Sequence, residues 1–555
     1  MSATVTAKRK RKRRKPKPGC APVKAKKRKK KRAAKPSALA AAQKRNRRKS
    51  RKKPLCKKKK RKPQPSGTHP APALPAAPSP APGPAPEVPA PPAPSGPEAS
   101  PIAVYQGTFG PRQAERLLWR AGFGPRPGDA DRLAAMGLDA AVFSLTRPSG
   151  AAPMVGAEPT VDGAPLSPLD TWSGPHLYWF DRRVRSGHQL VERLALVFHD
   201  WWATTNDAVG SNEMMLAQTN VFRQHGLGSF RELTRAMTTD RAMLVFLNGI
   251  DNRRRAVNEN YARELMELFT LGADRGAYTE TDVRELARAL TGWRADWSDE
   301  EGLQNFRFDA TRWDAGSKTV FGRTGAFTWE DACSLVVEHP LHASFFVAKL
   351  WSYFVPTPPP ADVAAALERA YVESGHQIRP VLEAILRSPE LYEGPRLTKP
   401  PVVQLAGMLR ALGRTITGEE WVWLSAEAGQ LLYHPPDVSG WDDKRWLDSN
   451  TIRARWDLVN SVVAGRSINP GSAAARAYPA ETPEQALAAA RAFWLDPRLE
   501  PETADSLLAY AQQFQPPADD ASTPQYRREQ RAQMRAQRQN ALRHLIAVSA
   551  DYQTS

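Results

Sequence analysis

The sequence predicts a mostly α-helical, multi-helix globular body that follows a disordered basic tail and a proline-rich linker. Three observations support this fold class. The 555-residue chain holds 16 Trp, all of them between Trp119 and Trp494, so its apolar material is concentrated in one long region. Within that region apolar residues recur every three or four positions, which is typical of helices. Ahead of it, residues 1–62 contain 32 Lys and Arg and no Asp or Glu, so they cannot bury a core.

The basic tail, residues 1–62, predicts a polyanionic partner. The rest of the chain carries 48 basic and 57 acidic side chains, a net charge of −9, so the overall charge of +23 belongs to the tail. This excludes a basic DNA-binding surface spread over the whole protein. A disordered polycation binds polyanions by counterion release, whatever their sequence, and nucleic acid is the abundant candidate. Anionic membrane, polyphosphate, or a tail that only aids solubility are the alternatives.

Residues 63–101 separate the tail from the body, because 16 of these 39 residues are Pro and the segment is expected to be an extended spacer. Cysteine is sparse, with only Cys333 in the body, so no internal disulfide is expected there. No apolar run approaches the ~18 residues of a transmembrane helix, and no signal-peptide core is visible. We therefore expect a cytoplasmic protein without a transmembrane segment, with envelope association as the alternative.

Helical patterns continue along residues 102–473, the first part of the predicted body. A short amphipathic helix over 113–120 ends at the Gly-Phe-Gly-Pro run 122–125, because Gly and Pro terminate helices. Thr279 and Asp282 form a variant capping box that predicts the start of another helix. Apolar spacing predicts further helices at 190–202, 230–237, 242–247, 257–271, 332–337, 341–354, 363–374, 378–386 and 402–412.

Residues 474–555 are expected to be the C-terminal helical part of the same body. A break over 474–483 precedes two or three helices, and the last spans 526–548 with Leu542, Leu545 and Ile546 on its inner face. Strands are expected only as one short hairpin within 305–328. No repeat of fixed period is visible.

Several long phrases of the body resemble an uncharacterised bacterial family, known as domain of unknown function 1800. They are RLLWRAGFGP (116–125), NENYARELMELFTLG (258–272), ARALTGW (287–293), DAGSKT (314–319), AKLW (348–351) and GQLLYHPPDVSGW (429–441). The resemblance extends from about Gly110 to Gln553 and implies a helical fold. It implies no reaction. Many members carry export signals, which this sequence lacks.

Two histidines of the family pattern are replaced here. Members often contain Trp-His-Asn-His-Phe where this chain has Phe198-His-Asp-Trp-Trp202, so Trp201 stands in place of a histidine. Members often contain His-Asp-Ala-Gly-x-Lys where this chain has Trp313 as the first residue. If those histidines bind a metal or transfer protons in relatives, the resemblance implies that this chain has lost that chemistry.

The predicted helix over 257–271 carries the most suggestive polar residues. Glu264 and Glu267 are i, i+3 neighbours, a spacing that can place two carboxylates on one water or one ion. With His199 they form a candidate catalytic group, and with His225 a candidate site for a divalent metal. Asn260 and Arg263 on the same face are candidate binding residues. The alternatives are a solvated face, Arg263 ion-paired with both glutamates, and a buried structural role for His199.

The remaining candidate binding residues are Asp314, Lys318 and Trp293. The segment 314–319 resembles the end of a phosphate loop, but both glycines of that motif are missing, which excludes nucleotide binding by this route. Lys318 could pair with Asp314 or bind an anion, and a structural turn is the favoured interpretation. Trp293 and three further Trp lie within 293–329, where indole faces could stack on sugar rings or fill gaps between helices.

Three hypotheses for the body follow, and the sequence alone does not decide whether it is an enzyme. It could be a metal-dependent or acid–base enzyme that uses the Glu264 and Glu267 helix. It could be a binding or scaffold protein whose polar faces are ion-paired surface. It could also be an envelope protein associated with glycan, with the tail bound to an anionic polymer.

Overall fold

The computed structural model describes residues 102–477, 480–514 and 523–555, all of which belong to one structural unit. The predictions for residues 1–62 and 63–101 lie outside the described residues. Helices make up most of the described chain, which confirms the mostly α fold class. Their bounds are α2 Pro111–Ala121, α3 Asp129–Met136, α4 Leu138–Thr146, α5 Gly174–Arg185, α6 Gln189–Trp201, α7 Asn206–Val209, α8 Asn212–His225, α9 Phe230–Thr238, α10 Arg241–Phe246, η1 Gly249–Asp251, α11 Asn260–Glu264, η2 Leu265–Thr270 and α12 Glu280–Ala289.

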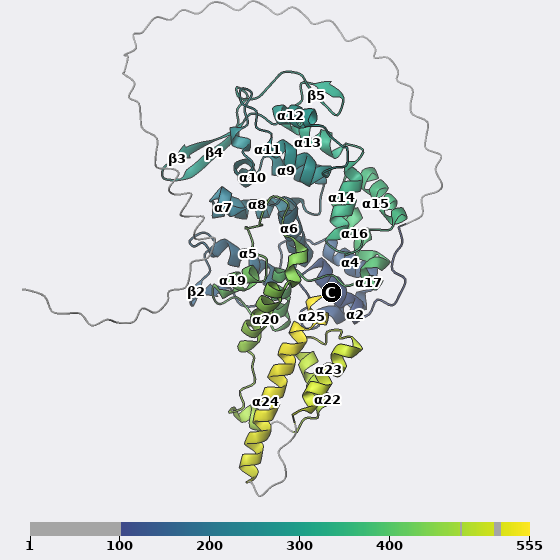
Figure 1. Ribbon diagram of the computed structural model, residues 1–555, viewed down its shortest axis with the longest axis vertical. Coiled ribbons are helices and arrows are strands. Elements are labelled where there is room, and N and C mark those ends of the chain that lie inside the picture. Colours follow the sequence, from purple (N-terminus) through teal and green to yellow (C-terminus); the bar gives the residue numbers. More distant parts are fainter. Residues whose placement is uncertain (1–101, 478–479, 515–522) are drawn as a thin grey trace, which may run out of the picture. The chain divides into compact units, whose positions relative to one another are not determined.

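The second half of the unit continues in the same way (Figure 1). Its helices are α13 Trp329–Val337, α14 His342–Ser352, α15 Ala361–Glu373, α16 Ile378–Arg387, α17 Pro389–Glu393, α18 Pro401–Ala411, α19 Glu420–Glu427, η3 Asp443–Leu447, α20 Ser449–Ala464, α21 Ala473–Ala477, α22 Pro483–Phe493, α23 Pro501–Gln512, α24 Pro524–Val548 and α25 Ala550–Gln553. None of the described helices is long and apolar enough to cross a membrane.

The predicted capping box is present at the start of α12. The Thr279 side chain accepts from the amide of Asp282, and the Asp282 carboxylate accepts from the amide of Thr279. Two of the four N-terminal amides therefore find partners, which fixes the point where the helix begins.

Three antiparallel hairpins interrupt the helices. The predicted hairpin within 305–328 is present as β5 Lys318–Val320 and β6 Arg323–Gly325. The expectation of a single hairpin was wrong, because β3 Trp293–Ser298 pairs with β4 Gly302–Phe308, and β1 Thr160–Val161 pairs with β2 Ala164–Pro165. In β3 the apolar Trp293, Ala295 and Trp297 alternate with Arg294, Asp296 and Ser298, a strand pattern that the sequence reasoning overlooked. A cross-strand ion pair of Arg307 with Asp296 adds to the pairing of β3 with β4.

The helix predicted over 257–271 differs from the expectation. It begins at Asn260 as α11 and widens into the π-helix η2 from Leu265 to Thr270, where the amide of Leu271 donates to the carbonyl of Met266. A π-turn leaves carbonyls without their usual i+4 donor. The indole of Trp201 donates to the carbonyl of Phe269 at 3.1 Å, and Nζ of Lys349 to that of Leu268 at 3.3 Å. Tertiary donors therefore stabilise a form that local propensity does not predict.

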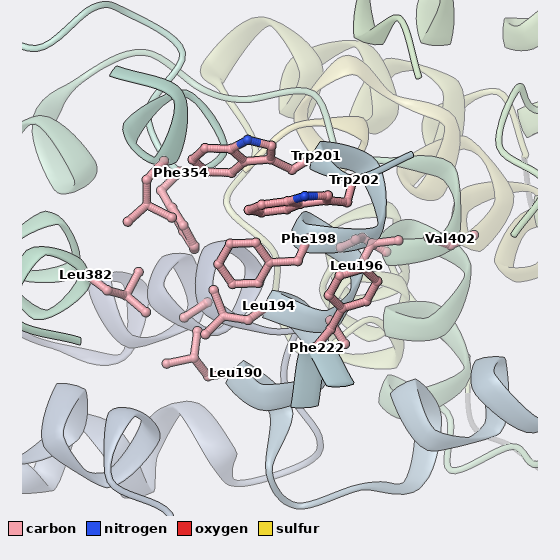
Figure 2. Close-up of a cluster of buried hydrophobic side chains, with 14 of the residues drawn as sticks. Leu190, Leu194, Leu196, Phe198, Trp201, Trp202, Phe222, Phe354, Leu382 and Val402 are labelled. Carbon is pink, nitrogen blue, oxygen red and sulfur yellow. The ribbon is translucent and has the colours of Figure 1, made fainter. Parts of the chain in front are cut away.

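The core surrounds α6. Figure 2 shows Leu190, Leu194 and Phe198 on its inner face, with the indoles of Trp201 and Trp202 beyond them, and all five are buried. The two indoles stack, with ring centroids 5.8 Å apart and planes 24° apart. Full burial of side chains this large is worth about 1.5–3 kcal/mol each, so the sequence pattern of α6 identifies the centre of the fold.

The C-terminal helices bring the end of the chain back to α2, where Trp119 contacts Tyr552 and Arg120 donates to the carbonyl of Ser555. α24 packs against α20, α22 and α23, and α25 follows beside α2 (Figure 1). The segment after α17 then pairs with the residues after α25: the amide of Lys399 donates to the carbonyl of Gln553, and Leu397 exchanges two hydrogen bonds with Ser555. This short antiparallel contact places Lys399 against α2.

Candidate functional site

Helix α2 arranges four side chains in one row. Arg112, Glu115, Arg116 and Trp119 are spaced i, i+3, i+4 and i+7, so they share one face of the helix. The opposite side of α2 buries Ala114, Leu117 and Leu118 in the core. Burial of that apolar side holds the row of charged residues at the edge of the core.

Lys399 lies over the end of this row. Its Nζ is 3.7 Å from the centroid of the Trp119 ring and 4.6 Å from that of Tyr552, and it donates to the Tyr552 carbonyl at 2.6 Å. Only 4% of Lys399 is exposed. Two aromatic faces and a carbonyl are the partners that a buried ammonium needs when no carboxylate is bonded to it.

Trp119 is held in place by two glycines. A Cβ at Gly407 in α18 would overlap the Trp119 ring, and one at Gly124 would lie 2.7 Å from it. Gly124 also has φ +78°, a conformation that L side chains rarely adopt. Backbone therefore approaches the indole closely from two sides, and the ring under Lys399 has little freedom to move.

The charges of Lys399 and Glu115 act on each other's pKa. Burial lowers the pKa of Lys399 to about 7, and Glu115 opposes that change while Arg396, Arg455 and Arg120 add to it. Burial raises the pKa of Glu115, and Lys399 opposes that rise. Both groups can therefore exchange protons closer to neutral pH than an ordinary lysine or glutamate.

The nearby arginines add positive charge with few carboxylates to balance it. Arg116 donates to the main-chain carbonyls of Tyr392, Gly394 and Pro395 at 2.7–3.1 Å, and its buried Nε has no hydrogen-bond partner. Burial, then Arg396 and Arg498, lower the pKa of Arg116. The guanidinium groups of Arg396 and Arg498 therefore repel that of Arg116 in this site.

Arg396 and Arg498 differ from Arg116 because they have anionic partners. Arg396 pairs with Glu500 at 2.7 Å and with Asp551 at 3.1 Å, and Arg498 pairs with Glu500 at 3.3 Å. Within the part of the chain that the structure describes, Arg112, Arg116 and Lys399 form no ion pair, and Glu115 acts on Arg112 and Lys399 only through the longer-range effect of its charge.

These side chains line a cleft of about 140 Å³. Arg112, Arg116, Arg396, Arg498 and Lys399 face it, against Glu115 and Asp551 as the acidic side chains. We call it the Lys399 cleft. A concave site with excess positive charge, an unpartnered buried Nε and a lysine near its titration point suits an anionic group, which would gain charge-assisted hydrogen bonds there.

The sequence-predicted residues on α11 and η2 lie elsewhere. Glu264 is half-buried, and burial followed by the charge of Glu267 raises its pKa. Arg263 does not pair with both of them: it donates to Glu280 at 2.7 Å and to Glu259 at 3.4 Å. That alternative was wrong, because Glu259 and Glu280 extend toward the guanidinium from the start of α11 and from α12.

Asn260 forms hydrogen bonds at the start of α11. Its side chain donates to Asn248 at 2.9 Å, and its amide donates to the side chain of Asn258 at 3.0 Å. These bonds hold the entry of the helix, as caps of this kind commonly do.

His199 and His225 are on other helices. His199 is buried on α6 between Trp179, Tyr433 and Trp441, whose ring centroids lie 5.1–5.5 Å away, and burial followed by Arg183 lowers its pKa to about 3. His225 is the last residue of α8. Among the described residues no group of three or more His, Cys, Asp and Glu side chains is arranged to hold a metal ion. The catalytic and metal roles of these residues stay predictions.

Asp314, Lys318 and Trp293 each have protein partners. Asp314 accepts from Arg288 at 2.8 Å, and Nζ of Lys318 donates to the carbonyls of Asp314 and Phe327. Trp293 packs edge-to-face on Phe308 and Trp329, each with a centroid distance of 5.7 Å. Lys318 therefore pairs with the main chain of Asp314 and not with its carboxylate.

Sequence reasoning missed Glu115 and Lys399. Arg116 and Trp119 belong to the first family phrase, but nothing local links them to a lysine more than 270 residues later. The sequence feature that could have indicated the site is Lys399 itself. A lysine directly before Pro400 and Pro401, between two predicted apolar helices, is expected to be shielded from solvent.

The comparisons with known proteins identify a family. No curated protein and no solved structure matches the chain. A family model described as a protein of unknown function (DUF1800) matches residues 116–554. The match begins at Arg116 and ends at Thr554, and both residues line the Lys399 cleft.

Proposed function

The chain belongs to the DUF1800 family, and we propose that its helical body binds an anionic group, such as a carboxylate or phosphate, in the Lys399 cleft. The observation that carries this proposal is the set of cations without carboxylate partners around a concave site. Buried charges in proteins are normally paired, because an unpaired charge loses its hydration without compensation. A bound anion would supply the missing partner.

The hydrogen-bonding groups support the same function. Nζ of Lys399 has three N–H groups and gives one to the Tyr552 carbonyl, and Nε of Arg116 has no partner. Hydrogen bonds between such cations and an anion are worth about 1.5–3 kcal/mol each. An anion beside Lys399 would also favour its protonated form, so binding near neutral pH would take up a proton.

Titration calorimetry of the full chain with acetate and with inorganic phosphate tests the proposal. Arg112→Leu removes an exposed cleft cation, whose attraction for an anion at about 4 Å in water is about 1 kcal/mol, so we expect affinity to fall about fivefold. Arg453→Leu is the matched control, because Arg453 is exposed on α20 and does not line the cleft. The tail contributes equally to both variants. Equal affinities for the two variants would refute the cleft as the binding site.

Polyanion association through residues 1–62 is a second function, favoured by 32 cationic residues in 62 with no acidic residue. Nucleic acid is the expected partner, and the tail would localise the body on it. Deletion of residues 1–62 should abolish retention on DNA at low salt, since counterion release depends on the number of cations involved. Unchanged retention would contradict this role.

A further inference from the structure

A second cavity continues from the Lys399 cleft. It has a volume of about 560 Å³ and runs between α2 and α3, with the turn after α22 on its other side. It shares Arg112, Gln113 and Glu115 with the cleft, so the two cavities adjoin along α2. Because acetate would occupy only the smaller cavity, a ligand that filled both would be extended.

The charge along this groove reverses away from the cleft. Asp131 in the first turn of α3 is exposed and has no ion-pair partner among the residues that the structure describes. Asp496 lies near Glu115, whose pKa it helps to raise, and pairs with Arg491 at 2.7 Å. The guanidinium of Arg126 donates to the carbonyls of Val184 and Arg185. Arg126 also lines the groove, where the charge of Asp129 acts on it, and Asp131 is the exposed carboxylate of the groove that has no ion-pair partner among the described residues.

Between these charges the groove is lined by residues with short or rigid side chains. Pro111, Pro125 and Pro127 line it together with Gly110 and Gly128. Such residues have no long side chains that could occupy the groove, and proline rings lose little entropy when a ligand covers them. Backbone or methylene groups of a ligand can therefore lie along this surface between the two charged ends.

Resting on the anion-binding function proposed above, we infer that the natural ligand is an extended zwitterion with the chemistry of a short peptide. Its carboxylate occupies the Lys399 cleft, its body follows the groove between α2 and α3, and its amine lies near Asp131. Both ends then meet an unpaired charge of opposite sign. A phosphate-headed or uniformly anionic chain would fit the cleft, but it would be repelled by Asp131.

Four probes test the two ends separately by titration calorimetry on the full chain. They are acetate, triglycine, N-acetyl-triglycine and triglycine amide. Triglycine has no net charge, so the basic tail gives it no advantage. We expect triglycine to bind at least about tenfold more tightly than acetate, since its amine adds a charged hydrogen bond. The amide, which has no carboxylate, should lose detectable binding.

Two tryptophan substitutions test whether the ligand lies in the groove. Ala130→Trp fills it, because Ala130 lines the groove, whereas Ala135→Trp on the exposed side of α3 is the matched control. Ala130→Trp should bring triglycine down to the affinity of acetate, and its unchanged acetate binding shows that the body is folded. Asp131→Asn should remove the advantage of triglycine over N-acetyl-triglycine without a bulky substitution.

The outcomes separate the two proposals. Binding of acetate with no gain for triglycine, or a gain that Ala130→Trp leaves intact, overturns the extended ligand and leaves the anion site standing. No binding of either probe overturns both. A gain for triglycine that is lost in Ala130→Trp and kept in Ala135→Trp supports the inference.

Discussion

Replacement of Lys399 by methionine should change how the stability of the protein depends on pH. Methionine fills a similar volume without the charge. Because the pKa of Lys399 is lowered to about 7 from the ordinary 10.5, the unfolded chain holds a proton there that the folded chain has lost. Between those values wild-type stability rises with pH, and below about pH 7 the folded state carries the whole penalty of a buried ammonium.

The expected size follows from the same values. Between about pH 9.5 and about pH 6, the wild type should lose about 3 kcal/mol of unfolding free energy at this position, at about 1.4 kcal/mol for each pH unit above 7. The Lys399→Met variant does not lose this free energy of unfolding, so its stability relative to the wild type increases as the pH falls. The substitution also leaves Glu115 without the cation that lowers its pKa. That second effect has the same sign, because Glu115 with a further raised pKa takes up a proton in the folded variant as the pH falls, which stabilises the variant at lower pH.

Denaturant unfolding at several pH values measures this difference. Lys349→Met is the matched control, since burial lowers the pKa of Lys349 to about 8 and the same reasoning predicts a change of about 2 kcal/mol. Other groups that titrate in this range cancel between the wild type and each variant. A Lys399→Met difference that does not vary with pH would refute the reasoning, because it would show that Lys399 keeps its proton throughout.

Other variants test neighbouring parts of the account. Gly407→Ala should destabilise the body by about 2 kcal/mol in denaturant unfolding, because the new methyl group would meet both the Trp119 ring and the carbonyl oxygen of Phe123, at a cost of about 3 kcal/mol against the about 1 kcal/mol that Ala gains in a helix; equal or greater stability would contradict the close contact. Glu115→Gln should lower the pKa of Lys399 further, since Glu115 raises it. The pH dependence of acylation at Lys399 measures this, and an unchanged profile would show that the two groups are not coupled.

Local sequence patterns predicted the elements that depend on local interactions. The capping box at Thr279 lies within one helical turn, and the apolar spacing along α6 lies within a single helix of 13 residues. The family resemblance is confirmed over residues 116–554. The π-helix from Leu265 was not predictable in this way, because its freed carbonyls are bonded by Trp201 and Lys349 from distant helices.

Trp201 has a structural role in this chain. It donates to the carbonyl of Phe269 and stacks on Trp202 in the core. An indole has one donor and no acceptor nitrogen, so it satisfies that carbonyl but cannot bind a metal. This residue therefore contributes to the packing of α6 against η2.

The Lys399 cleft was not predictable for a different reason. Its residues come from α2, from the segment before α18, from the turn after α22 and from the end of the chain. Each is unremarkable in its own sequence context, and only the pairing of Leu397 and Lys399 with residues 553–555 brings them together. Candidates chosen by short spacing, such as Glu264 with Glu267, could not reveal a site made by contacts of long sequence separation.

Site-resolved acylation of the full chain would show whether an anion binds beside Lys399. Peptide-level mass spectrometry would follow the labelling of Lys399 by an acetylating reagent, with and without acetate as the anion, and Lys349 would serve as the internal reference. We expect acetate to slow labelling at Lys399, because a bound anion covers the amine and keeps it protonated, and to leave the labelling of Lys349 unchanged. Equal labelling of Lys399 with and without the anion would contradict this expectation.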